Sequence, residues 1–194
     1  MSRPRPLSHD PIAEAYRQWV AHGWESVADG MALVTSLVRA QQIVMARVDE
    51  ALKPSGLTFS RYELLQLLSF SRTGALPMAK ASARLQVHPT SVTNTVDRLE
   101  AAGLVVRVPH PSDRRATLIE ITDAGRKSVA EATAALNAEV FAEPGLPAEQ
   151  GRDLLRLLAQ FRHDAGDFEV DPENLAFHAT WQSSGESSTD SLGS

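Results

Sequence analysis

The sequence of 194 residues contains no cysteine. This absence excludes a disulfide framework, a thiolate nucleophile, a thiol redox switch and a cysteine-ligated zinc or iron–sulfur cluster. No stretch approaches the roughly 20 apolar residues that a membrane span needs. The N-terminus, MSRPRPLSHD, also lacks the apolar segment of a secretory signal, so we expect a cytoplasmic protein with no membrane partner. The apolar fraction of 43% is ordinary for a globular domain with its own core.

The net charge is −5, which by itself argues against a protein that binds nucleic acid. The charge is unevenly distributed, however. The segment 72–115 carries a net charge of +4, and the rest of the chain carries −9. Because salt screens charges beyond about 10 Å at 0.1 M, a phosphate backbone responds to the local charge rather than the total. The basic middle of this acidic chain is therefore compatible with DNA binding.

The N-terminal part of the sequence predicts two helices. Asp10 is a candidate N-cap followed by proline, and Gly23 is a candidate stop, which predicts a short amphipathic helix over 10–24. Apolar residues at helical spacing then predict a long helix from about Glu25 to Leu52, ended by the Pro54-Ser55-Gly56 sequence.

The middle of the sequence predicts a helix-turn-helix. Ser60-Arg61-Tyr62-Glu63 has the pattern of a capping box, which predicts a third helix that begins at Ser60 and ends near Thr73-Gly74. A short extended piece is expected at 75–77, a short helix at 78–85 and a tight turn at 86–87. Pro89 then opens another helix, in which Val92, Val96 and Leu99 form one buried stripe.

The hydrophobic period changes from 3.6 to 2 after Gly103. The runs LVVRVP and ATLIEIT, separated by the polar HPSDRR, predict an antiparallel hairpin with a long loop. Thr122 is expected to cap a helix from 123 to about 142, and a last amphipathic helix is expected over roughly 147–163. Residues 1–9 and the acidic, serine-rich tail 165–194 are expected to be disordered, because their composition offers too little apolar surface to bury.

A helix-turn-helix followed by a hairpin has the dimensions to bind DNA. A helix from Pro89 to Ala102 is about 21 Å long at 1.5 Å per residue, and a major groove about 12 Å wide admits one helix. Burial of the apolar stripe leaves six polar residues facing outward: Thr90, Ser91, Thr93, Asn94, Asp97 and Arg98. These residues could simply be solvated, but the arginines at the hairpin tip, Arg114 and Arg115, favour insertion into a minor groove.

The stretch VHPTSVTNTVDRLEAAGLVVRVPHPSDRRATLIEITDAGR resembles the signature of the MarR family of transcription regulators. The resemblance covers roughly 25–163 and implies a mainly α-helical fold with a small β wing. The implied winged helix-turn-helix lobe spans about 58–122, and the implied dimerisation helices span about 25–53 and 123–164. It also implies a homodimer that binds double-stranded DNA, with the helix from Pro89 in the major groove and the wing in the minor groove.

The resemblance further implies roles for particular residues. The family's Asp-x-Arg wing motif is matched by Asp113 and Arg115, the arginine contacting DNA and the aspartate orienting basic neighbours. The full set expected to contact DNA is Pro89, Thr90, Ser91, Thr93, Asn94, Arg98, Asp113, Arg114, Arg115, Lys80, Ser60 and Arg61.

The extra helix around Trp19 resembles one found in a urate-responsive subgroup, where a tryptophan helps to line the ligand site. That subgroup has an aspartate where this chain offers Glu63, so the match is incomplete. An effector pocket framed by Trp19, Trp24, Met31, Tyr62 and Glu63 is one hypothesis, and ordinary core residues are the other. The thiol-based peroxide sensors of the family are excluded by the lack of cysteine.

Other functional classes find little support in the sequence. The six histidines are scattered, so no metal site is expected, although some family members bind zinc through histidine and carboxylate ligands. His88 is expected to cap the helix that follows it, and His110 to lie on the wing. With no catalytic spacing and no phosphate loop, neither an enzyme nor a cofactor is expected. A winged helix that binds protein instead of DNA remains an alternative.

The hypothesis from sequence is a ligand-responsive homodimeric repressor. A twofold dimer would bind a pseudo-palindromic operator with half-sites about 34 Å apart.

Overall fold

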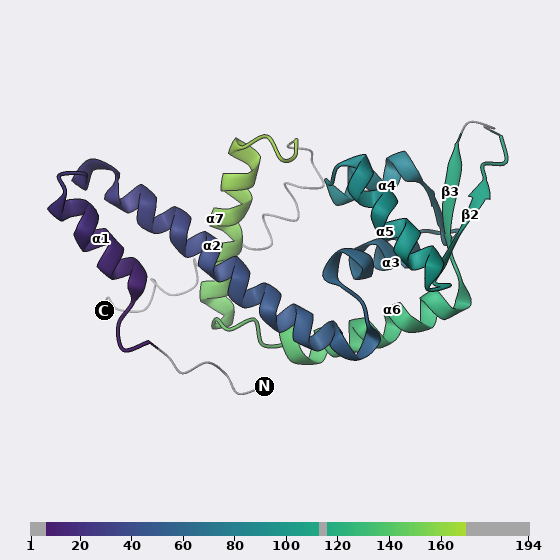
Figure 1. Ribbon diagram of the computed structural model, residues 1–194, viewed down its shortest axis with the longest axis horizontal. Coiled ribbons are helices and arrows are strands. Elements are labelled where there is room, and N and C mark those ends of the chain that lie inside the picture. Colours follow the sequence, from purple (N-terminus) through teal and green to yellow (C-terminus); the bar gives the residue numbers. More distant parts are fainter. Residues whose placement is uncertain (1–6, 113–115, 170–194) are drawn as a thin grey trace, which may run out of the picture. The chain divides into compact units, whose positions relative to one another are not determined.

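The computed structural model describes residues 7–112 and 116–169 (Figure 1). The chain divides into two compact units, Met1–Val140 and Phe141–Ser194, which are described separately below. The expected mainly α-helical fold with a small β wing is confirmed. The wing tip 113–115, most of the arm 1–9 and most of the tail 165–194 lie outside the described residues.

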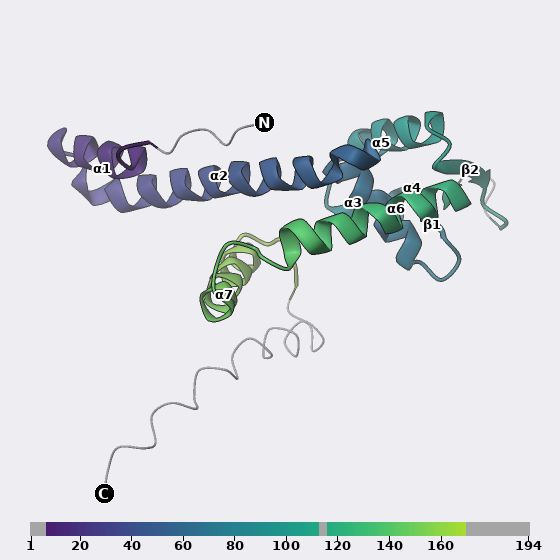
Figure 2. The ribbon, with the colours of Figure 1, turned by 90° about the horizontal axis from the view of Figure 1, so that it is seen from below.

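The first two helices lie where the sequence predicts them. In α1 (Pro11–Ala21), the Asp10 carboxylate accepts a hydrogen bond from the Ile12 N–H at 2.9 Å, as expected of an N-cap. Gly23 adopts a φ of 81°, which reverses the chain into α2 (Glu25–Leu52). The two helices lie side by side, with α1 along the N-terminal part of α2 (Figures 1 and 2).

The predicted start and end of the third helix were wrong. α3 (Phe59–Phe70) follows the short 3₁₀ turn Lys53–Ser55, and Thr58 rather than Ser60 occupies the N-cap position, with no side-chain capping bond. The helix begins earlier because Phe59 packs against the core, and the Tyr62 N–H already donates to the Thr58 carbonyl at 2.9 Å. It ends at Phe70 because Ser71 is extended, with its hydroxyl donating to the Leu68 carbonyl at 2.8 Å.

The helix-turn-helix is confirmed. The strand β1 (Ala75–Pro77) leads into α4 (Met78–Leu85), and α5 (Pro89–Ala101) follows. The turn between the helices places Gln86 in the left-handed region with φ 52°. The Ser82 hydroxyl stabilises this turn by donating to the Val87 carbonyl at 2.7 Å.

The wing is an antiparallel hairpin on the edge of a three-stranded sheet. β2 (Val105–Pro109) pairs with β3 (Thr117–Ile121), and β3 also pairs with β1, which gives the order β1-β3-β2. Ile119 and Ile121 point into the core, whereas Leu118 and Glu120 occupy the opposite face of the same strand. The sheet therefore closes one side of the core and extends beyond it.

α6 (Asp123–Leu136) completes the core of the first unit. The Thr122 hydroxyl accepts from the Gly125 N–H at 3.0 Å, so the predicted cap is confirmed. The Thr133 hydroxyl lies 3.2 Å from the Tyr62 hydroxyl and ties α6 to α3. The helix was predicted to continue to about residue 142, but α-helical geometry ends at Leu136 and a π-helical turn, Asn137–Phe141, follows.

The second unit contains one described helix, α7 (Ala148–Asp164), close to the predicted range. Four of its large apolar residues are exposed in this single chain: Leu154, Leu155, Leu157 and Phe161. The helix is followed by an ion pair between the Arg162 guanidinium and Asp167, with Nε and the carboxylate oxygen 2.6 Å apart.

Gly125 provides a test of how closely α6 approaches the end of the helix-turn-helix. A methyl group at Gly125 would overlap the carbonyl oxygen of Leu104 and the side chain of Ile121. Gly125→Ala should therefore lower the free energy of unfolding by about 1–3 kcal/mol, because a backbone carbonyl cannot move aside alone. As a control, Gly30→Ala on exposed α2, where a Cβ meets no atom within 4 Å, should raise it by roughly 0.5–1 kcal/mol. Urea unfolding followed by circular dichroism measures both, and a gain at both positions would contradict the close contact.

Candidate nucleic-acid interface

The outer face of α5 is polar and open to solvent. Val92, Val96 and Leu99 are at most 2% exposed, so the stripe predicted to be buried is confirmed. The residues expected on the other face are all exposed: Pro89, Thr90, Ser91, Thr93, Asn94, Asp97 and Arg98. Burial of one stripe fixes the rotation of the helix about its axis, which presents this polar face outward.

The N-terminus of α5 is capped as predicted. The His88 ring nitrogen Nδ1 accepts a hydrogen bond from the Thr90 N–H at 3.3 Å, and Pro89 occupies the first turn, where its missing N–H leaves no unpaired donor. The Ser91 and Val92 N–H groups both donate to the His88 carbonyl, at 2.8 and 3.3 Å, so the N–H groups of the first turn already have partners within the chain. What this end of the helix offers an anionic partner is the positive end of the helix dipole.

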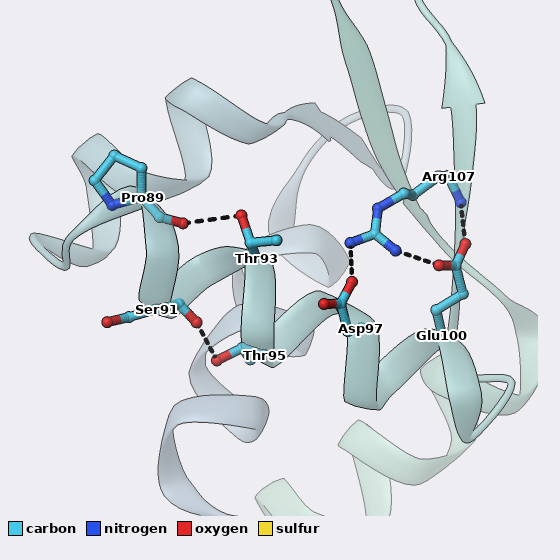
Figure 3. A network of polar contacts seen from close by, with 7 residues as sticks. All are labelled: Pro89, Ser91, Thr93, Thr95, Asp97, Glu100 and Arg107. Carbon is cyan, nitrogen blue, oxygen red and sulfur yellow. Dashed lines mark hydrogen bonds and ion pairs between the residues drawn. The ribbon is translucent and has the colours of Figure 1, made fainter.

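The hydroxyl groups on α5 differ in what they offer to a ligand (Figure 3). The Thr93 hydroxyl donates to the Pro89 carbonyl at 3.1 Å, and the Thr95 hydroxyl donates to the Ser91 carbonyl at 2.9 Å. Both hydroxyl protons are therefore used in hydrogen bonds within the helix. The side chains of Thr93 and Thr95 can offer a ligand only the acceptor lone pairs of their oxygens and their methyl groups. Within the described residues no hydrogen-bond partner is found for the side chains of Ser91, Asn94 or Arg98.

Arg107 on β2 is held by two carboxylates of α5 (Figure 3). Its Nη2 donates to Asp97 Oδ1 at 2.5 Å, its Nη1 donates to Glu100, and its backbone N–H donates to the other Glu100 oxygen at 3.1 Å. Hydrogen bonds to Asp97 and then to Glu100 raise the pKa of Arg107 in spite of its partial burial. This group, named here the Arg107 clamp, fastens the wing hairpin to α5.

The clamp was not predicted from the sequence. Asp97 was expected only to face outward; it is exposed, but its carboxylate is bound to Arg107. The available signal was an acidic pair, Asp97 and Glu100, spaced i, i+3 on one helix face and followed by a single basic residue in the next strand. A helix-to-strand contact has no sequence period, which is why patterning alone did not identify it.

The base of the wing is ordered by hydrogen bonds of His110, which lies on the wing as predicted. The His110 N–H donates to the Ala116 carbonyl at 3.1 Å, and the Ser112 N–H lies 3.3 Å from His110 Nδ1. The predicted tip residues Asp113, Arg114 and Arg115 lie outside the described residues.

The remaining predicted DNA contacts come from two other helices. Lys80 is exposed on α4, Ser60 is exposed on α3, and Arg61 on α3 is half-buried. Ser60, Glu63 and Ser91, which come from two different predicted sites, line one cavity of about 50 Å³ between α3 and α5. Burial raises the pKa of Glu63. Since a water molecule takes up about 30 Å³ in the liquid, this cavity is too small for an organic effector.

The residues of the predicted effector pocket fall into two sets within the chain. Trp19 and Trp24 meet edge to face with ring centroids 5.4 Å apart at the α1–α2 turn, and Met31 follows on α2. Tyr62 is buried in the core, and Glu63 lies beside it on α3. α2 is about 42 Å long at 1.5 Å per residue and separates the two sets.

The described residues also contain neither a metal-binding cluster nor a membrane-spanning helix. No group of three or more histidine, aspartate or glutamate side chains there could hold a metal ion. None of the helices in 7–112 and 116–169 is both long and apolar enough to cross a membrane.

Comparisons with known proteins agree with this geometry. Residues 55–116 match the model of the MarR family. The MarR family transcriptional regulator Sco5413 from Streptomyces coelicolor is 50% identical, with a TM-score of 0.66 over 73% of this chain and 99% of that chain. CouR from Rhodococcus jostii RHA1, bound to p-coumaroyl-CoA, is 28% identical, with a TM-score of 0.60 over 72% of this chain and 95% of that chain. The transcriptional repressor CouR bound to a 23-mer DNA duplex is 29% identical, with a TM-score of 0.59 over 65% and 89% of the two chains.

The Arg107 clamp predicts coupling between α5 and the wing. In a double-mutant cycle of Glu100→Gln and Arg107→Met, the unfolding free energies should be non-additive by about 0.2–1 kcal/mol, as for a solvent-accessible ion pair. Glu120, exposed on β3 opposite Val106, supplies the control carboxylate. Glu120→Gln combined with Arg107→Met should be additive. Urea unfolding of the single and double variants measures both cycles, and equal coupling in the two would show that the clamp is only general charge attraction.

Proposed function

This chain belongs to the MarR family of transcriptional regulators, and from that premise we propose that it is a ligand-responsive homodimeric repressor that binds a pseudo-palindromic operator. The family consists of DNA-binding regulators rather than enzymes, and the chain is a DNA-binding regulator. The single observation that carries the finer proposal is that the polar face of α5 and the wing are joined. Burial of the apolar stripe turns the polar face of α5 outward, and the Arg107 clamp fastens this helix to the wing.

The proposed DNA contacts rest on the exposed face of α5 and, for the wing tip, on the resemblance to the family's wing motif. α5 has 13 residues and is about 20 Å long, and it enters a major groove about 12 Å wide with its N-terminal half. Ser91 and Asn94 contact base edges, and Arg98 contacts phosphate. The wing, with Asp113 and Arg115, enters the adjacent minor groove. Lys80, Ser60 and Arg61 are assigned to the flanking backbone.

The homodimer is supported by apolar side chains that no described residue covers. On α2, Val27 is 56% exposed, Val34 60% and Val38 49%; on α7, Leu157 is 67% exposed and Phe161 61%. Helix faces of this kind are typical of surfaces that a partner buries. We assign residues 25–53 and 123–164 to dimerisation, 58–122 to DNA binding and 10–24 to an added helix.

Regulation by a small molecule is supported by a relative. CouR is named a transcriptional repressor, and its structures hold either DNA or p-coumaroyl-CoA. In this chain an effector needs to favour the conformation that does not bind DNA by only about 1–3 kcal/mol to lower the DNA affinity by roughly 5–150-fold.

Substitutions should separate base contacts from phosphate contacts. Arg115→Ala should weaken binding to the DNA upstream of the gene and reduce the slope of log K against log salt by about one unit. Asn94→Ala should instead reduce the preference for that DNA over a random duplex while leaving the slope nearly unchanged. Lys127→Ala on α6, outside the proposed contacts, is the control. Fluorescence anisotropy at several salt concentrations measures all three, and an equal loss on both duplexes for Asn94→Ala would contradict its assignment to bases.

Charge placed on the exposed apolar faces should separate the subunits. Val38→Glu and Leu157→Glu should each shift the protein from dimer to monomer in sedimentation velocity, because a charged group would be buried at the interface. Val106→Glu, on a β2 position that is 41% exposed, should leave the dimer intact. Circular dichroism checks that the helices persist. A wild-type protein that sediments as a monomer would overturn the proposed dimer.

A further inference from the structure

We propose that a cation-lined hollow beside the wing binds a small organic anion, and that an effector acts there directly on the wing. This inference rests on the proposed function, because it names the chemistry and the place of the effector. The hollow has a volume of about 460 Å³ and lies where the end of α3, β1, α4 and the base of the hairpin meet. We call it the basic hollow; the residues used here are Phe70, Arg72, Lys80, Arg84, His110 and Leu118.

The charged side chains that line the basic hollow in the described part of the chain are Arg72, Lys80 and Arg84. No aspartate or glutamate among the described residues joins them. None of these three has an ion-pair partner within the described residues, whereas Arg17, Arg107, Arg156 and Arg162 are each paired with a carboxylate. Lys80 and Arg84 are spaced i, i+4 on α4, where like charges repel. An anion in the hollow would relieve this repulsion.

The apolar part of the lining indicates an anion with a carbon body. Phe70 is 79% exposed at the end of α3, and Leu118 adds an apolar side chain from the outer face of β3. A bare inorganic anion would use the cations alone, whereas an aromatic carboxylate would also cover Phe70. The volume lies within the range of about 300–1,000 Å³ found for small-molecule sites. The cavity beside Glu63, by contrast, measures about 50 Å³.

The position of the hollow gives a bound ligand access to the wing. His110 and Pro111 line it, and His110 makes the hydrogen bonds that order the base of the wing loop. A ligand there would therefore contact α4 on one side and the root of the wing on the other. It would also neutralise cations that otherwise attract DNA phosphate. Both effects lower DNA affinity, and neither requires a change at the dimer interface.

DNA phosphate shares the anion chemistry of this site, and Lys80 is itself a proposed backbone contact. The experiment must therefore separate a small ligand from the DNA backbone. The probe is 2-naphthoate, with the neutral 2-naphthamide as its matched control and inorganic phosphate as the anion without a carbon body. The variants are Arg72→Gln, Arg84→Gln and Phe70→Ala in the full chain, with Arg17→Gln on exposed α1 as the control for loss of a surface charge.

Isothermal titration calorimetry should detect 2-naphthoate binding and no binding of 2-naphthamide. Arg72→Gln and Arg84→Gln should each weaken binding by about tenfold or more, as expected for the loss of one charge-assisted hydrogen bond. Phe70→Ala should weaken 2-naphthoate binding as well, and Arg17→Gln should not. In anisotropy assays 2-naphthoate should lower the DNA affinity of the wild type but not that of Arg84→Gln. Circular dichroism establishes that each variant is folded.

Each contrary result overturns the inference in a recognisable way. Binding of 2-naphthoate that is unchanged in Arg72→Gln and Arg84→Gln would place the ligand elsewhere. Weaker DNA binding by these variants without any 2-naphthoate binding would make the hollow a phosphate contact. Displacement by inorganic phosphate together with an unaffected Phe70→Ala would make it a simple anion site. In all three cases the proposed regulator stands if the wild type binds its DNA, whereas loss of DNA binding by the wild type would contradict the proposed function itself.

Discussion

The burial of three side chains on α5 determines which face of this helix is turned outward, where DNA can reach it. Val92, Val96 and Leu99 pack into the same core as Leu64, Leu68 and Ile119, so α5 cannot rotate without exposing them. Fully burying one such side chain stabilises the fold by about 1.5–3 kcal/mol. The orientation of the short polar side chains on the opposite face is thus fixed by the buried stripe, with which they make no contact of their own. The Arg107 clamp then adds a directional link from this helix to the hairpin.

Most of the fold could be predicted from the sequence because its signals are local. Asp10 and Thr122 act as caps as expected, and the change of period after Gly103 located the hairpin. The errors occurred where tertiary packing decides between local alternatives. Ser60 and Thr58 are both good N-cap residues, and the burial of Phe59 decides in favour of Thr58. The π-helical turn after Leu136 has no local sequence signal of this kind.

The candidate site was predictable only in part, for the same reason. The exposed face of α5 follows from periodicity, so its residues could be named in advance. The pairing of Arg107 with Asp97 and Glu100, and the gathering of Arg72, Lys80 and Arg84 around one hollow, join elements that are separate in the sequence. Among the described residues, Arg107 is paired with carboxylates, whereas Arg72 and Arg84 have no ion-pair partner. This uneven pairing makes the proposed anion site compatible with an acidic chain, and only the three-dimensional arrangement shows which cations are paired.

The junction between α5 and α6 has a mechanical consequence. The Thr122 hydroxyl donates to the Gly103 carbonyl at 2.8 Å, the Thr122 N–H donates to the Leu104 carbonyl at 3.1 Å, and Gly125 lies against that same carbonyl. The start of α6 and the end of α5 therefore form one rigid unit. A rotation of this unit as a whole by about 10° would displace the far end of the 20 Å helix α5 by roughly 3.5 Å, about the rise of one base step along a strand. A small rotation of this unit would thus move the far end of α5 by about one base step relative to the DNA.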